Sequence, residues 1–185
     1  YNLYMKKFHA ADLLVGKNIT RFPISTAYLE FYDDNLFIVS GDGIISYEKL
    51  EKFINNNEDI STNIIKSNIL DVITDKSFLE HSFTGVKDIA IIDDKVYLSY
   101  SVKIEGNCRN TSILSAQLNY EYLTFEKFLT PSQCITDGGD FGIKGYWNTG
   151  GRIVNKDDNY IYFTHGTYGS ELLAQDRNSI FGKVV

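Results

Sequence analysis

The sequence has 185 residues, a length that suits one sizeable domain. Hydrophobic residues make up 43% of the chain and charged residues 23%, which argues against extended disorder, and the net charge of −6 disfavours nucleic acid as a partner. No apolar run approaches the roughly 20 residues that a membrane-spanning helix needs. The 13 Tyr and 12 Phe, beside only two Pro, favour β-strands because aromatic side chains pack well on a pleated sheet.

Three segments share one pattern, in which an apolar strand, a turn with two aspartates and an aromatic strand follow one another. They are residues 29–40, 89–100 and 153–164, and their aspartate pairs stand at 33–34, 93–94 and 157–158. Asp and Asn tolerate positive φ at a hairpin tip, so each pair predicts a tight reversal of the chain. The distance of about 60 to 64 residues between the turns indicates a repeated structural unit.

Further strand-like runs complete each unit. Residues 44–47, 111–118 and 123–129 predict strands, and Glu48–Asn55 predicts one short helix. Four strands per unit, with longer loops between units, predict an all-β protein with the architecture of a β-propeller. We expect about three four-stranded blades, in units of about 20–60, 61–135 and 136–185.

Three blades do not close a ring. A propeller removes its exposed edge strands only by completing the circle, so we expect residues 1–185 to form one partial domain of a six-bladed ring. The chain opens on Tyr1 rather than Met, and the remaining blades are expected beyond residue 185.

The most specific motifs lie in the last forty residues. Gly150-Gly151-Arg152 precedes a predicted strand, Gly166 and Gly169 follow the next one, and residues 174–184 read Ala-Gln-Asp-Arg-Asn-Ser-Ile-Phe-Gly-Lys-Val. This ordered series resembles the glucose/sorbosone dehydrogenase family, the soluble sugar dehydrogenases that use pyrroloquinoline quinone (PQQ). Residues 85–90 and 96–100 resemble the same family more weakly. The resemblance implies a six-bladed propeller that oxidises an aldose or a related alcohol at its central mouth, with PQQ and calcium as cofactors.

The resemblance also implies a catalytic pair, a His that takes the proton of the sugar hydroxyl and an Asp that orients this His. In this sequence the His position falls closest to Asn148 or Thr149, the Asp position falls on Thr167, and a Gln that contacts the quinone aligns with Phe83. An Asn amide does not accept a proton near pH 7, and a Thr hydroxyl carries no negative charge. The implied cofactors are therefore not supported by these residues.

Two side chains near the motif have alternative interpretations. His165 stands two residues before Thr167, so it is either a replacement base at the mouth, with Asp176 or Asp140 as its partner, or a ring packed at a strand end. Arg152 either binds an anionic carboxylate of the quinone or clamps a neighbouring carbonyl or carboxylate, for example that of Asp176.

Aromatic residues near the predicted mouth are candidates for sugar binding. Trp147 precedes the motif and Tyr168 lies within it, between Gly166 and Gly169, and aromatic faces suit sugar rings. Residues 136–142 contain two aspartates but lack the ligand series of an EF-hand, so we interpret them as a mouth loop and assign no metal site. Two functions remain open, a sugar dehydrogenase and a non-catalytic propeller that binds a glycan or a protein.

Cys108 and Cys134 are the only cysteines of the chain, and they flank two predicted strands of one unit. Antiparallel neighbours can bring such ends within disulfide distance, so a disulfide and a pair of free thiols are both open. Asp12 interrupts the apolar stretch that follows Met5-Lys6-Lys7, and we predict no signal peptide in these residues. Since the family that the chain resembles is typically exported, we expect a periplasmic or extracellular protein.

Overall fold

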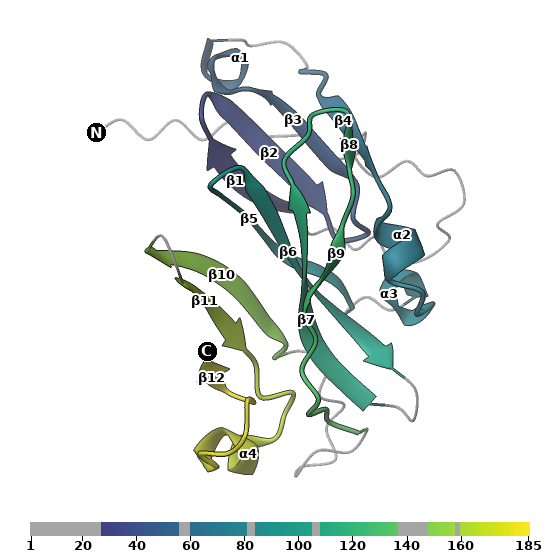
Figure 1. The fold of residues 1–185 in the computed structure, drawn as a ribbon, viewed down its shortest axis with the longest axis vertical. Helices are drawn as coiled ribbons and strands as arrows, with labels where there is room; N and C mark the ends of the chain where they lie inside the picture. Colours follow the sequence, from purple (N-terminus) through teal and green to yellow (C-terminus); the bar gives the residue numbers. More distant parts are fainter. Residues whose placement is uncertain (1–26, 56–59, 81–83, 105–107, 137–147, 158–159) are drawn as a thin grey trace.

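In the computed structural model of the chain, the described residues are 27–55, 60–80, 84–104, 108–136, 148–157 and 160–185. Three β-sheets follow one another along the chain, and the described helices are short (Figure 1). The predicted all-β class is therefore confirmed.

The first sheet contains the first of the predicted aspartate hairpins. Its strands, in spatial order, are β1 (Ala27–Tyr32), β2 (Asn35–Ser40), β3 (Ile45–Lys49), β4 (Asn63–Ser67) and β8 (Tyr122–Leu123). The strands β1 to β4 are antiparallel, whereas β8 pairs with β4 in parallel. Asp33 has a φ of 50° at the turn between β1 and β2, as expected for a tight hairpin. The first sheet extends to Ser67, past the unit boundary that we placed near residue 60.

The second sheet is four-stranded and antiparallel. Its strands are β5 (Gly85–Ile92), β6 (Lys95–Ile104), β7 (Cys108–Gln117) and β9 (Glu126–Leu129). Asp93 and Asp94, with φ of 49° and 57°, form the two-residue turn between β5 and β6. Two consecutive positive φ values match the right-handed twist of a two-residue hairpin. The second predicted hairpin is confirmed.

The single strand predicted over residues 123–129 is divided between two sheets. Its beginning belongs to β8 in the first sheet, and its end forms β9 in the second. Asn68 holds the crossing point, because its amide oxygen accepts the Phe125 N–H at 2.7 Å and its amide nitrogen donates to the Phe125 carbonyl at 3.1 Å. The expectation of one continuous strand here is wrong, because these contacts depend on a residue 57 positions away.

The third sheet contains the third hairpin. Its strands are β10 (Gly150–Asp157), β11 (Tyr160–His165) and β12 (Lys183–Val184), all antiparallel. Asp157 pairs with Tyr160, so the chain reverses where the sequence predicts it, while residues 158 and 159 of the turn lie outside the described residues.

The helices add little to the core. They are α1 (Leu50–Asn55), α2 (Ile69–Val72), α3 (Ser77–Glu80) and α4 (Glu171–Gln175). The helix α1 lies inside the predicted stretch, whereas the other three are too short to show helical periodicity in the sequence. None of the described helices is long and apolar enough to cross a membrane.

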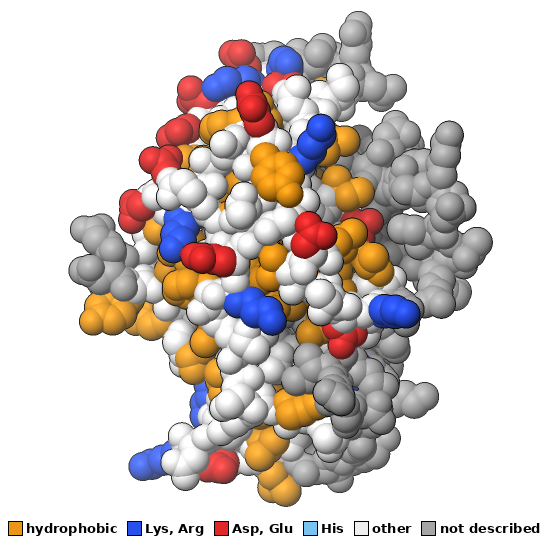
Figure 2. All heavy atoms as spheres, turned by 45° about the vertical axis from the view of Figure 1, so that its right-hand side comes forward, with side chains coloured by type: hydrophobic (Ala, Val, Ile, Leu, Met, Phe, Trp, Pro, Cys, Tyr) orange, Lys and Arg blue, Asp and Glu red, His pale blue; other side chains and the backbone are white. Residues whose placement is uncertain are grey.

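The first strands of the three sheets pack side by side. The strand β5 contacts β1 on one side and β10 on the other (Figure 1). One buried cluster joins the first two sheets and includes Phe37 and Leu98, and a second cluster joins the last two sheets through Ile113 and Ile153. Consecutive sheets that pack in this way are arranged as propeller blades. On the face shown in Figure 2, charged and hydrophobic side chains alternate over the described surface, and acidic side chains follow its upper left edge.

Candidate functional site

The segment before β10 is bound to the loop after β11 through backbone groups. The Asn148 carbonyl accepts the Tyr168 N–H at 3.1 Å, and the Thr149 carbonyl accepts the Gly166 N–H at 3.0 Å. A Cβ atom at Gly166 would lie 1.8 Å from the Asn148 carbonyl oxygen, so only glycine permits this close approach. The glycine of the family motif therefore has a structural role here.

The same segment also contacts the second sheet. Ser99 in β6 donates its hydroxyl to the Gly151 carbonyl. A Cβ atom at Gly151 would lie 2.4 Å from Cβ of Lys87, and Gly151 has a φ of 113°. These contacts hold the beginning of β10 against β5 and β6. Asn148, two residues before β10, is exposed. We call residues 148–152 with Lys87 and Thr167 the mouth segment.

His165 is buried within the protein. Its side chain is 2% exposed and packs against Phe181 and Phe163, with ring centroids 4.8 and 6.0 Å away. The Thr111 N–H donates to Nε2 at 3.3 Å, which leaves the proton on Nδ1, 3.2 Å from the Gly166 carbonyl. Burial lowers the pKa of His165 and favours the neutral ring. This geometry fits the packed ring, and it gives the alternative of a base at the mouth no support.

Tyr168 is also buried, with only 1% of its side chain exposed. Its hydroxyl lies 2.5 Å from Oγ1 of Thr111, and burial raises its pKa. Because neither face of the ring is accessible, the expectation that Tyr168 binds a sugar must be corrected. Trp147, the other aromatic candidate, lies outside the described residues, as do Phe83 and Asp140.

Thr167, at the position of the family Asp, is half-buried. Its hydroxyl oxygen accepts the Gly169 N–H at 3.3 Å, which stabilises the turn after β11. The Thr167 side chain therefore stabilises the backbone of its own loop.

Arg152 pairs with Asp88 of β5, with Nη1 and Oδ1 3.2 Å apart. The Asp88 carboxylate is 2% exposed and also accepts the Ile153 N–H at 2.8 Å. Burial raises the pKa of Asp88, while the Ile153 N–H and Arg152 lower it. Asp88 thus connects β5 with β10. This ion pair supports the interpretation that Arg152 clamps a neighbouring carboxylate. The partner is Asp88 and not Asp176, whose carboxylate accepts the Asn178 N–H of its own loop at 2.9 Å.

Two further ionisable groups on β1 and β5 were not identified from the sequence. Burial lowers the pKa of Lys87 to about 8, and it raises the pKa of Glu30, which also accepts a backbone hydrogen bond from Ile91. Their spacing carries no recognisable motif. The only indication in the sequence was that a charged residue, Lys87, interrupts the apolar residues of the strand β5.

Cys108 and Cys134 are joined as a disulfide, with Cα atoms 5.4 Å apart. The backbones of Arg109 and Ile135 exchange two hydrogen bonds next to it, at 2.8 and 2.9 Å. The disulfide and this bridge attach the loop after β9 to the beginning of β7.

The mouth segment does not fit the implied quinone chemistry. Asn148, which is expected from the sequence to lie near the position of the family base, is an exposed amide, and the one described histidine has both ring nitrogens beside backbone partners. Among the described residues, no three or more His, Cys, Asp or Glu side chains gather to hold a metal ion. Within the described part of the chain, therefore, neither the implied histidine base nor a cluster of carboxylates for calcium is found.

Comparison with protein families matches residues 31–185 to the glucose/sorbosone dehydrogenases. The chain belongs to this family. No curated protein sequence matches it. The match includes residues of all three sheets, so the resemblance first noted in the last forty residues extends over the described structure from residue 31 onward.

Solved structures support the fold. The soluble aldose sugar dehydrogenase of Escherichia coli, in its apo form, is 18% identical with a TM-score of 0.59, and the match covers 88% of this chain and 44% of that one. A putative oxidoreductase (glucose dehydrogenase) of Thermus thermophilus is 20% identical with a TM-score of 0.51, with 85% and 42% covered. This family member spans less than half the length of either relative. The predicted β-propeller is confirmed, whereas the number of blades and the division into units stay predictions.

Proposed function

We propose that the complete protein binds a sugar at the mouth of a sugar-dehydrogenase-type propeller without the histidine-dependent oxidation that the resemblance implies. Family membership supports a sugar or glycan as the ligand. The observation that carries the rest of the proposal is the exposed Asn148 at the position of the family base. An amide donates and accepts hydrogen bonds to sugar hydroxyls, but it does not remove a proton.

The surrounding residues are consistent with a binding role. Oxidation of an anomeric hydroxyl requires a group that accepts its proton, and general bases need a pKa near the working pH. His165 is buried and engaged on both ring nitrogens, and Thr167 has no ionisable side chain. In this arrangement Asn148 orients a ligand and the glycine-bound loops keep the amide in place.

Quinone-dependent oxidation of an aldose is the second candidate, and Lys87 is the observation that favours it. This side chain lies against Gly151 of the mouth segment, and its pKa of about 8 leaves a fraction of the amine neutral at neutral pH. A neutral amine accepts a proton. Under this alternative, PQQ and calcium would be held largely by residues outside those described.

The two candidates are separated by assays on the complete protein supplied with PQQ and Ca²⁺. We expect isothermal titration with D-glucose and cellobiose to detect binding that Asn148→Ala weakens, while no sugar-dependent dye reduction exceeds that of a protein-free control. The exposed Asn178 provides a matched control, and Asn178→Ala should leave the affinity unchanged. Sugar-dependent dye reduction by the unmodified protein would overturn the proposal that the protein binds sugar without oxidising it. Loss of that dye reduction in Lys87→Gln would then assign the proton transfer to Lys87.

We also propose a periplasmic or extracellular location. The disulfide between Cys108 and Cys134 is the supporting observation, because structural disulfides persist in oxidising compartments. Fractionation of cells that express the complete protein, followed by thiol labelling without reductant, tests this point.

A further inference from the structure

A cavity of about 630 Å³ lies at the turn between β1 and β2. The strand β5 separates it from the mouth segment, because Lys87 near the beginning of β5 lies against Gly151, whereas Asp94 after its end bonds to Tyr32 beside the turn. An extended strand rises about 3.3 Å per residue, so the two regions are roughly 20 Å apart. The cavity is thus distinct from the site considered above.

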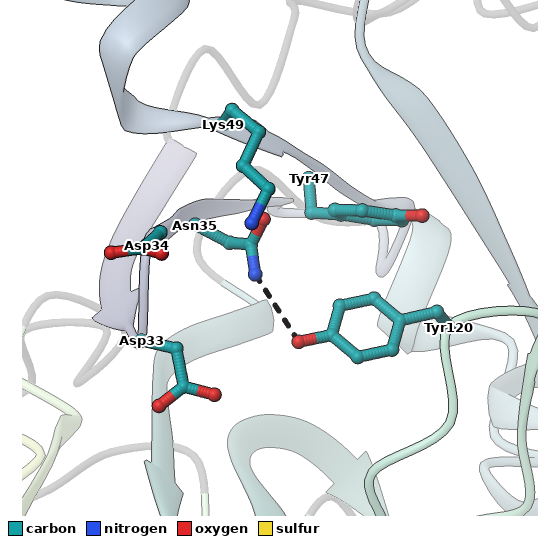
Figure 3. Close-up of a pocket in the computed structure, with 6 residues that line it drawn as sticks. All are labelled: Asp33, Asp34, Asn35, Tyr47, Lys49 and Tyr120. Atoms are coloured by element: carbon teal, nitrogen blue, oxygen red, sulfur yellow. Dashed lines mark hydrogen bonds between the residues drawn. The ribbon is translucent and has the colours of Figure 1, made fainter.

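The cavity is built from three parts of the chain that are distant in sequence. The β1–β2 turn, the strand β3 and the segment between β7 and β8 supply its walls (Figure 3). The lining residues are Asp33, Asp34, Asn35, Tyr47, Lys49 and Tyr120. Its size lies within the range of pockets that hold small organic ligands.

Two tyrosines form an aromatic corner in this cavity. The ring centroids of Tyr47 and Tyr120 are 4.8 Å apart with an angle of 64° between the planes. Phe37 stacks on Tyr47 from the core at 5.7 Å and holds it in position. Tyr120 remains 37% exposed, so an aromatic surface is available to a ligand. Aromatic rings pack against the C–H faces of sugar rings at low entropic cost.

The polar groups around this corner are fixed and mixed in charge. The buried Asn35 amide donates to the Tyr120 hydroxyl at 3.2 Å, and Figure 3 shows the Lys49 amine on the other side of that amide. Asp33 lines the same cavity as Tyr120, and burial and the charge of Asp33 raise the pKa of Tyr120. The carboxylate of Asp34 points away from the rings.

The presence of both a carboxylate and an ammonium group in the cavity favours a neutral polar ligand over a charged one. The Asp33 carboxylate repels an anion, and the Lys49 ammonium repels a cation in the same cavity. A neutral polyhydroxylated ring uses both, because its hydroxyl groups donate to Asp33 and accept from Lys49 and the amide. We propose that the cavity between the β1–β2 turn and Tyr120 is a second site of the protein, which binds a neutral sugar ring. The proposal does not depend on the function proposed for the mouth segment.

The experiment uses saturation-transfer difference NMR and calorimetry on the complete protein, with D-glucose, cellobiose and N-acetylglucosamine as probes. To isolate the cavity, the probes are titrated into protein carrying Asn148→Ala. We expect Tyr120→Ala to weaken binding at least about fivefold, since one aromatic contact is lost. Asp33→Asn should weaken it about threefold, and it keeps the backbone because Asn also adopts positive φ.

The matched control is Tyr160→Ala, which removes an exposed tyrosine from the third sheet. It should leave the affinity unchanged, and thermal melting verifies that each variant is folded. The proposal is overturned if none of the three sugars binds to the Asn148→Ala protein, or if Tyr120→Ala binds them as tightly as its parent. The two proposals fail in different ways. If the mouth segment does not bind sugar, Asn148→Ala leaves the sugar affinity of the otherwise unmodified protein unchanged, and this result says nothing about the cavity.

Discussion

The regions around the two ends of β5 use polar side chains in different ways. At its beginning, Asp88 and Ser99 bind backbone groups of β10, and the glycines let the loops approach closely. At its end, Asp33 and Lys49 border an open cavity. The first region carries the family motif and is mainly scaffold, whereas the second has no motif and offers accessible groups. A dense sequence motif therefore indicates close packing as readily as it indicates a ligand site.

The largest effect is expected from Gly166→Ala, in the loop that packs against the mouth segment. The added Cβ would lie 1.8 Å from the Asn148 carbonyl oxygen, and backbone must move to admit it. We expect unfolding to become easier by about 3 kcal/mol or more. Urea denaturation measures the change, and Ser132→Ala on the surface is the control. An unchanged midpoint would show that this loop is not closely bound to Asn148.

The disulfide should contribute nearly as much to the free energy of unfolding. Cys108 and Cys134 are 26 positions apart, and a loop of this length corresponds to about 3 kcal/mol in the chain-entropy description. We expect the double variant Cys108→Ala/Cys134→Ala to lose this amount in urea denaturation. Adding dithiothreitol should destabilise the unmodified protein by a similar amount and leave the variant unaffected. An equal response of both proteins would contradict the bond.

A pH-dependent effect is expected from His165. Its folded-state pKa lies below the ordinary value near 6.5, so the unfolded chain binds the proton more readily. The contribution of His165 to stability is therefore complete above about pH 7 and is lost as the pH falls through 6.5 towards the folded-state pKa. His165→Phe keeps an aromatic ring among Phe163 and Phe181 and should remove this part of the pH dependence. Denaturation at several pH values compares the two proteins, and parallel curves would contradict the buried neutral ring.

The smallest effects are expected at the connection between β5 and β10. Asp88→Ala leaves the Ile153 N–H without its acceptor and should cost about 1–3 kcal/mol. Arg152→Ala should cost about 1 kcal/mol or less, because the Arg152 side chain is 69% exposed and its ion pair is screened by water. Urea denaturation measures the free energy of unfolding of both variants. A larger loss of stability in Arg152→Ala than in Asp88→Ala would contradict the assignment of Asp88 as the group that connects β5 with β10.

Much of the fold could be predicted because its signals are local. The pairs Asp33-Asp34 and Asp93-Asp94 form the turns that their chemistry predicts, and the alternating strands pair around them. The site was less predictable. The motif located the mouth segment, but the burial of His165 and Tyr168 depends on Thr111 in β7 and on Phe181 in the turn before β12.

By itself, the sequence determined the hairpins, the all-β class and the family, because turn propensity, strand alternation and motif spacing all act between residues close in the chain. Only the tertiary structure decided which polar groups are buried and which line an accessible pocket. Asn35 meets Tyr120 across 85 positions, and Asn68 divides a predicted strand between two sheets. Such contacts form when sheets pack against each other, and no local pattern records them because their free energy comes from groups that meet only in the folded protein.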